Sequence, residues 1–306
     1  MPPALAERAL DGLLYWGWRG LAAAVQHLPE RLTYAAAVLG GEIVYLAWRS
    51  RRRVAKENFA VVLDKPAAHP EVARIARRSF RNFGKYLTEI MRFPILEGDD
   101  FRRLVAVDGW EHLRAATARR RGLIFVSIHL GNFELGGARI ADEIPLNVIA
   151  DDLENQRLMD LLVGNRAHKN ITIHRPEGAA KKVLHALRRN EMVGLMMDLG
   201  PRSESFGNVE ATFFGAPARF PTVAANLARV SGAPIVVAAV IRERDNTFRG
   251  IALPPILVER TREASGDIER ATQAIVSGLE SFVRHWPDQW YIFRPMWPAA
   301  SEPAGP

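Results

Sequence analysis

The segment LIFVSIHLGNFELGG, residues 123–137, directs the interpretation of the whole chain. Its first six residues are apolar except for Ser127 and largely of strand-forming type, which predicts a strand covered on both faces. The run ends at His129, and a carboxylate, Glu134, follows five positions later. One such pair is expected by chance among 8 histidines and 34 acids, so the spacing alone does not identify a site.

The chain between the two side chains determines whether they can act together. On one continuous helix, five residues would rotate them about 140° apart. If His129 ends a strand and Glu134 lies in the first turn of the next helix, Gly131 and Asn132 let the chain turn between them. We then expect the Glu134 carboxylate to hydrogen-bond one imidazole nitrogen and leave the other as a general base. With no cysteine and no G-x-S-x-G serine elbow, this favours direct activation of a substrate hydroxyl, and acyl transfer is the simplest such reaction.

Strand-like and helical segments alternate over most of the chain after residue 100. Strands are predicted at 104–109, 123–128, 146–150, 171–174, 193–198, 209–215 and 234–243. This alternation predicts an α/β fold with a mostly parallel central sheet flanked by helices. Ligands of such sheets bind at the carboxyl ends of strands, where His129 falls.

Composition limits the partners and the chemistry. The 306 residues are 48% apolar and carry a net charge of +7, mostly through arginine, which favours an anionic partner. The absence of cysteine excludes disulfides, thiolate metal sites and an acyl-cysteine intermediate. The remaining histidines, such as His168, His174 and His185, lack zinc-binding spacing, so no metal is expected.

Two apolar helical segments, residues 10–28 and 32–48, precede the alternating region. Charged and polar residues interrupt both, so neither is a clean membrane span, and no signal peptide is indicated. Both are rich in Trp and Tyr, and the second is followed by four cations, Arg49, Arg51, Arg52 and Arg53. This pattern favours a helical hairpin that lies in an anionic leaflet. The alternative is a hairpin packed on the body of a soluble protein.

Six sequence blocks in order resemble the bacterial lipid A lauroyl/myristoyl acyltransferase family, which includes the phosphatidylinositol mannoside acyltransferases. The blocks are RVAKENFAVVL (53–63), RNFGKYLTEIMRFP (81–94), GWEHLRAATARRRGLIFVSIHLGNFELGG (109–137), NQRLMDLLVGNRAHKNI (155–171), LRRNEMVGLMMD with VEATFFGAPARFPTVAANLARVSGAPIV (187–198 and 209–236), and WPDQWYIF (286–293). The phenylalanine-proline-glutamate-glycine-threonine-arginine block of glycerolipid acyltransferases is absent.

The resemblance implies roles for particular residues. His129 and Glu134 lie on the family's His-x4-Asp/Glu positions, and Arg166 best matches its functional arginine. Asp198 and Glu210 fall at strand ends near the expected cleft, where each could orient His129 or a sugar hydroxyl, or cap the next turn. Arg202 and Arg219 are candidates for phosphate binding. The aromatic residues of the segment 286–297 are interpreted as core or interface packing.

The resulting hypothesis is an acyltransferase at the cytoplasmic face of the bacterial inner membrane. It moves a fatty acyl chain from acyl-CoA or acyl carrier protein, used as a substrate without any cofactor, to a hydroxyl of a membrane glycolipid, either a lipid A precursor or a phosphatidylinositol mannoside. Residues 1–53 would associate with the membrane, residues 54–298 would form the acyltransferase domain, and 299–306 would be a flexible tail. The alternatives are an esterase or thioesterase that activates water and a non-enzymatic basic membrane-binding protein. Nucleic acid is not expected as a partner, because the cations are spread along helices.

Overall fold

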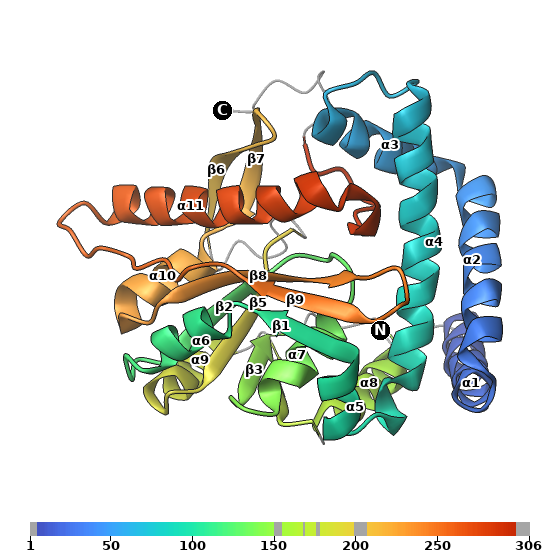
Figure 1. Cartoon of the computed structure of the whole chain (residues 1–306), viewed down its shortest axis with the longest axis horizontal. Coiled ribbons are helices and arrows are strands. Elements are labelled where there is room, and N and C mark those ends of the chain that lie inside the picture. The colour runs from blue at the N-terminus through green and yellow to red at the C-terminus, as the bar shows by residue number, and fades with distance from the viewer. Residues whose placement is uncertain (1–4, 150–154, 168, 176–177, 199–206, 298–306) are drawn as a thin grey trace.

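The computed structural model describes residues 5–149, 155–167, 169–175, 178–198 and 207–297 (Figure 1). The helices are α1 Leu5–His27, α2 Glu30–Ala47, α3 Arg49–Leu63, α4 Pro70–Arg92, α5 Gly98–Leu104, α6 Trp110–Thr117, α7 Phe133–Ala141, α8 Gln156–Ala167, α9 Ala179–Arg188, α10 Val223–Ser231 and α11 Ala264–His285, with short 3-10 turns η1 Phe93–Ile95 and η3 Pro287–Gln289. The strands are β1 Val105–Asp108, β2 Leu123–Ser127, β3 Leu146–Ile149, β4 Ile171–His174, β5 Met192–Met196, β6 Asn208–Phe213, β7 Ala216–Pro221, β8 Ile235–Arg242 and β9 Phe248–Ala252.

Seven of the nine described strands form a central sheet of order β1-β9-β8-β2-β5-β3-β4. The pairs from β8 through β2, β5 and β3 to β4 are all parallel, whereas β9 runs antiparallel to β8 and pairs in parallel with β1. The predicted α/β class with a mostly parallel sheet is therefore confirmed. The sequence interpretation placed the strand at 209–215 in the same series, but β6 pairs only with β7, in a separate antiparallel hairpin.

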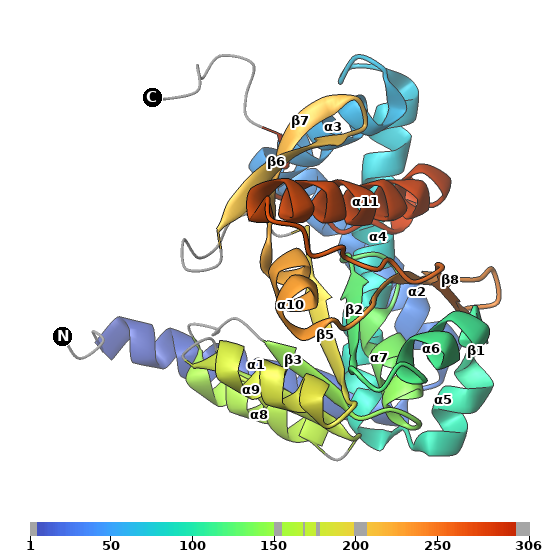
Figure 2. The same ribbon diagram turned by 90° about the vertical axis from the view of Figure 1, so that its left-hand side faces the viewer.

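Helices cover both faces of the sheet, and the side chains of β2 alternate between the two layers. Ile124 and Val126 join a core cluster that includes side chains of α9, α10 and α11, whereas Leu123 and Phe125 join a second cluster with α5, α6 and α7. All five residues of β2 are buried, as a strand covered on both faces requires. In Figures 1 and 2, α11 and α10 lie on one side of the sheet, and α5 and α7 lie on the other.

The two N-terminal helices rest on the long helix α4. A side chain at Gly41 of α2 or at Gly84 of α4 would collide with backbone of the opposite helix, so these glycines allow the two helices to approach closely. Glu42, the acid that interrupts the second apolar segment, forms ion pairs with Arg77 and Arg81 of α4. The two predicted helices are confirmed, but α1 and α2 run in clearly different directions, and both contact α4 (Figures 1 and 2).

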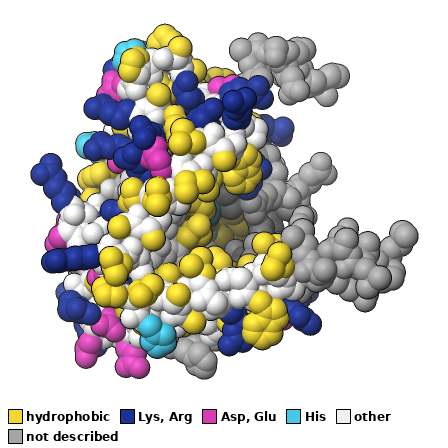
Figure 3. Space-filling view, turned by 90° about the vertical axis from the view of Figure 1, so that its right-hand side faces the viewer, with side chains coloured by type: hydrophobic (Ala, Val, Ile, Leu, Met, Phe, Trp, Pro, Cys, Tyr) yellow, Lys and Arg dark blue, Asp and Glu magenta, His cyan; other side chains and the backbone are white. Residues whose placement is uncertain are grey.

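Exposed apolar side chains concentrate on α1 and α2. Among the described residues, 11 of the 14 exposed large hydrophobic side chains lie between Leu13 and Trp48. Examples are Leu39 at 62% and Trp16 at 63% relative exposure. Figure 3 shows hydrophobic side chains gathered on this side of the molecule around a hollow, with cations above and beside them. Within the described residues, no helix combines the length and the apolar character needed to cross a membrane.

Candidate active site

His129 lies just beyond the carboxyl end of β2, the strand at the centre of the sheet order. Asp198 follows the carboxyl end of β5, which pairs in parallel with β2 in the register Ser127 to Met196. The two side chains therefore meet at the same edge of the sheet, although 69 positions separate them. Ligands of open α/β sheets bind at this edge.

Asp198 holds His129 by two hydrogen bonds. Its Oδ2 accepts from the His129 backbone N–H at 2.9 Å, and its Oδ1 lies 2.6 Å from His129 Nδ1. The buried indole of Trp290 donates a third bond to Oδ2 at 2.9 Å. The His129 side chain keeps 22% of its surface exposed, while that of Asp198 keeps 1%. The histidine is therefore fixed at one ring nitrogen and accessible elsewhere.

The electrostatics of Asp198 favour a carboxylate. Burial raises the pKa of Asp198, but the facing imidazole charge and the hydrogen bonds from His129 and Trp290 outweigh burial, so the pKa lies below its usual value. An ionised Asp198 accepts hydrogen bonds only, so His129 Nδ1 carries a proton. When the imidazole is neutral, Nε2 is then the basic nitrogen.

The prediction that Glu134 hydrogen-bonds to His129 is wrong. Glu134 lies in the first turn of α7, as predicted, but its carboxylate binds Arg166 of α8: Oε2 accepts from Nε at 2.9 Å, and Oε1 accepts from Nη2. The physical reason is that Asp198, from the adjacent strand, already occupies Nδ1, while α8 offers Glu134 a bidentate guanidinium. Of the roles predicted for Asp198, the one that orients His129 is observed.

The Glu134–Arg166 pair is largely enclosed. The exposed fractions of the two side chains are 13% and 19%. Burial alone would lower the pKa of Arg166, but the charge and hydrogen bonds of Glu134 raise it above its ordinary value. The phenol of Tyr86 is buried beside this pair, and burial, followed by the charge of Glu134, raises its pKa. Phe133 contacts both Tyr86 and His129, and its ring centroid lies 5.0 Å from the ring centroid of each.

The turn between His129 and α7 depends on a glycine and an asparagine. Gly131 has φ +64°, and a Cβ there would collide with the carbonyl oxygen of Val240 in β8. Asn132 caps α7 by accepting from Leu135 N at 3.0 Å, and its own N–H donates to Val240 O at 3.0 Å. The predicted turning role of these two residues is confirmed.

A buried ion pair anchors this turn to the rest of the molecule. Glu89 of α4 binds Arg242 of β8, with Oε2 2.9 Å from Nη2, and the same oxygen accepts from Asn132 Nδ2 at 2.6 Å. Both charged side chains are about 5% exposed or less. Gln289 joins the network by exchanging hydrogen bonds with the Arg242 backbone at 2.7 and 2.9 Å and by accepting from Gly131 N at 2.9 Å through its own backbone oxygen.

Sequence reasoning missed most of this support. The sequence predicts a packing role for Trp290, and its side chain is fully buried, but its indole N–H also donates to Asp198. Glu89, Arg242 and Gln289 were not singled out. The available signal was the position of two charged residues in largely apolar sequence. Glu89 lies in the segment 86–95, and Arg242 directly follows the run 235–241. Burying such charges costs free energy unless they are paired.

The other predicted site residues do not join His129 in the described structure. Glu210 is exposed on the β6–β7 hairpin, directly opposite Arg219, and no contact with His129 or Asp198 is observed. Arg202 lies outside the described residues. Among the described side chains, no three His, Asp or Glu residues come close enough together to hold a metal ion. The substrate-binding roles of Glu210, Arg202 and Arg219 stay predictions.

Comparison with known proteins identifies the family. The model of the bacterial lipid A biosynthesis acyltransferase family matches residues 6–298. The chain belongs to this family. It is therefore an acyltransferase, as its sequence blocks indicated, and the resemblance on which that expectation rested is confirmed.

Family members of two kinds are similar to the chain. The phosphatidylinositol mannoside acyltransferase of Mycobacterium tuberculosis is 26% identical over 302 residues, which cover 96% of this chain and 90% of the relative. The lipid A biosynthesis lauroyltransferase of Escherichia coli is 26% identical over 247 residues, which cover 79% of each. The crystal structure of a Thermotoga maritima 1-acyl-sn-glycerophosphate acyltransferase covers 83% of this chain and 98% of its own, with 14% identity and a TM-score of 0.37.

Proposed function

We propose that the protein transfers a fatty acyl chain from an acyl thioester, acyl-CoA or acyl carrier protein, to a hydroxyl of a membrane glycolipid. The observation that carries this proposal is His129, which is bound through Nδ1 to a buried carboxylate and is partly exposed at a strand end. Family membership supplies the reaction class. The acceptor is inferred from the names of the relatives, of which the phosphatidylinositol mannoside acyltransferase matches over more of the chain.

In this mechanism His129 Nε2 takes the proton of the acceptor hydroxyl while the oxygen attacks the thioester carbonyl. The negative charge that develops on the carbonyl oxygen requires a fixed donor. Arg166 is suited to this role, because Glu134 binds its Nε and Nη2, and Nη1 can still donate a hydrogen bond to a substrate oxygen. As the carbon–sulfur bond breaks, His129 returns its proton to the leaving thiolate. Asp198 stabilises the imidazolium between the two steps.

Glu134 thus acts through Arg166. A neutral side chain at position 134 would leave the Arg166 guanidinium free to change direction. Glu134 therefore stays important for catalysis in this proposal, but it orients Arg166 instead of His129. The proposal also requires a long apolar groove beside His129, because both substrates carry lipid chains.

His129→Ala tests the reaction. Removal of the base is expected to lower acyl transfer by about 10²–10⁴-fold, measured with radiolabelled acyl-CoA and either a phosphatidylinositol mannoside or a lipid A precursor. His185→Ala is the matched control, because His185 is exposed on α9. Full transfer by the His129 variant would refute the mechanism. Release of free fatty acid that does not depend on any acceptor would instead support the thioesterase alternative.

The same proposal places the protein on a membrane surface through α1 and α2. Their exposed apolar side chains would enter the leaflet, and neighbouring cations would attract anionic lipid. Arg51 and Arg52 donate to backbone carbonyls of the protein itself, so replacing them would also disturb the fold.

The double change Leu39→Ser and Leu46→Ser is therefore the better test of membrane binding. It is expected to weaken binding to phosphatidylglycerol vesicles in a flotation assay. Val230→Ser with Leu257→Ser removes two exposed apolar side chains elsewhere and is expected to leave binding unchanged. An equal effect of both pairs would count against this placement.

A further inference from the structure

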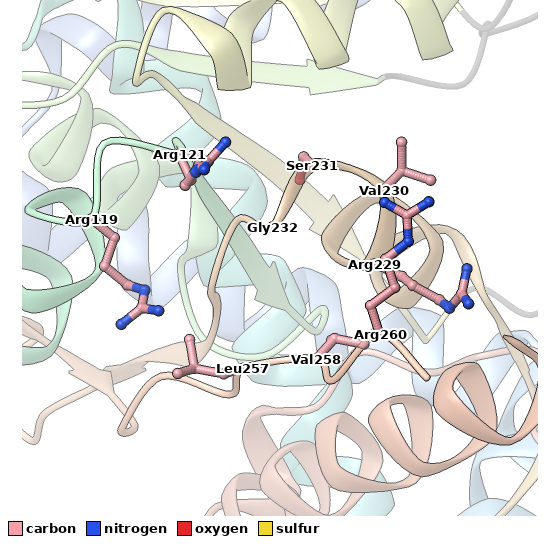
Figure 4. A pocket seen from close by; sticks show the side chains of 9 residues that line it. All are labelled: Arg119, Arg121, Arg229, Val230, Ser231, Gly232, Leu257, Val258 and Arg260. Atoms are coloured by element: carbon pink, nitrogen blue, oxygen red, sulfur yellow. The ribbon is translucent and has the colours of Figure 1, made fainter. Parts of the chain in front are cut away.

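A cationic cavity lies at the edge of the sheet opposite the candidate active site. It has a volume of about 630 Å³ and is lined by residues that precede β2 and β8 and by the segment after β9 (Figure 4). The lining residues are Arg119, Arg121, Arg229, Val230, Ser231, Gly232, Leu257, Val258 and Arg260. Because β2 separates Arg121 from His129, the length of a five-residue strand, roughly 17 Å, separates the two sites.

The cavity carries positive charge that the described part of the chain does not neutralise. Four of its nine lining residues are arginines, and none is acidic. Arg229 donates to Asp267 at 2.9 Å, but Arg270 shares that carboxylate at 2.7 Å. Among the described residues, the guanidinium groups of Arg119, Arg121 and Arg260 form no hydrogen bond or ion pair. The carboxylate of Asp267, which Arg229 and Arg270 share, therefore offsets only part of the positive charge at the cavity.

The arrangement of the side chains indicates what would bind. In Figure 4, Arg119 and Arg121 stand on one side of the cavity and Arg229 and Arg260 on the other, with Leu257 and Val258 between them. Guanidinium groups on two sides suit an anion with more than one phosphate group, since each arginine can donate a fork of hydrogen bonds to phosphate oxygens. The apolar wall would contact an uncharged part of the ligand, and the volume lies within the usual range for small-molecule sites.

A lipid headgroup is the less suitable source of this phosphate. The exposed apolar surface concentrates on α1 and α2, whereas the cavity lies near α6, α9 and α10 on the other side of the molecule (Figures 1 and 2). A membrane that contacts α1 and α2 would leave the cavity facing water. We propose that this cavity is a binding site for a soluble small molecule with two or more phosphate groups, separate from the site of acyl transfer.

Isothermal titration of the full chain with inorganic triphosphate at fixed ionic strength tests this proposal. We expect saturable binding of one triphosphate per chain. Arg119→Gln with Arg121→Gln should weaken it about tenfold or more, because two charge-assisted contacts are lost. Arg114→Gln with Arg244→Gln removes the same charge from exposed arginines that do not line the cavity, and should change the dissociation constant less than about twofold.

The possible results distinguish a specific triphosphate site from non-specific electrostatic attraction and from lipid binding. Equal weakening by both double variants, or no saturable binding, would overturn the proposal. It would also be overturned if the Arg119 and Arg121 changes reduced binding to phosphatidylglycerol vesicles and left triphosphate binding intact. Acyl transfer by the Arg119 and Arg121 variant is expected to stay at the wild-type level, so failure here leaves the proposed function untouched.

Discussion

Asp198 binds His129 twice, through the backbone N–H and through Nδ1, so it fixes both the position of the residue and the direction of its ring. A carboxylate that accepts at Nδ1 selects the tautomer with a free Nε2. Asp198→Asn would place an amide at this position, and an amide N–H facing Nδ1 would favour the opposite tautomer. We expect kcat for acyl transfer to fall by about 10²–10⁴-fold with a small change in KM.

A conservative variant distinguishes this effect from loss of structure. Asp198→Glu keeps a carboxylate that can accept from Nδ1, so it should retain more of kcat than Asp198→Asn. If both variants show normal thermal unfolding and lose kcat equally, the positioning role would be contradicted.

Gly131 is required for the turn that carries His129 to α7. Gly131→Ala would place a Cβ against the carbonyl oxygen of Val240 at a positive φ, and is expected to cost about 3 kcal/mol or more of unfolding free energy. Gly232 also has a positive φ, but a Cβ there meets no atom within 4 Å, so Gly232→Ala should cost only about 1 kcal/mol. Urea unfolding measures both, and equal losses would show that backbone strain alone matters at Gly131.

The local part of the site could be predicted from sequence, and the long-range part could not. The apolar run 123–128, the glycine and the asparagine were enough to place His129 at a strand end and Glu134 at a helix start. The partner of His129 depends on strand order, because β5 pairs directly with β2 although β3 and β4 come between them along the chain. The spacing within one chain segment therefore favoured Glu134, the neighbour in sequence, over Asp198, the neighbour in space.

The same limit applies to the strands that were not predicted. β9 is short and contains Gly250, and β7 contains prolines at positions 217 and 221, so neither carries a strong strand signal. Each becomes a strand because a preceding strand offers it an antiparallel partner: β8 for β9, and β6 for β7. Pairing of this kind overrides local propensity.

The buried pair of Glu89 and Arg242 is expected to be costly to break on one side only. Glu89→Gln would leave a buried guanidinium without its counter-charge and weaken the bond to Asn132, and should lower unfolding free energy by about 3–5 kcal/mol. Glu89→Met with Arg242→Met removes both charges and should be less destabilising than the single change. Glu71→Gln, at a partly exposed surface pair, should be the least destabilising of the three changes. Chemical unfolding of the three variants ranks them, and a double variant less stable than Glu89→Gln would contradict the cost assigned to the unpaired charge.

Asp267 makes the stability of the fold depend on pH under acidic conditions. Hydrogen bonding from Arg229, opposed by burial and aided by Thr261, lowers the pKa of its carboxyl from 3.8 to about 2. Because the folded-state pKa is lower than the unfolded one, the contribution of Asp267 to stability is present above about pH 3.8 and disappears as the pH falls towards 2. Asp267→Asn should therefore destabilise the protein at pH 7 and lose less additional stability than the wild type between pH 5 and pH 2. Urea midpoints for both proteins across this range measure the difference, and parallel curves would show that Asp267 does not titrate in that window.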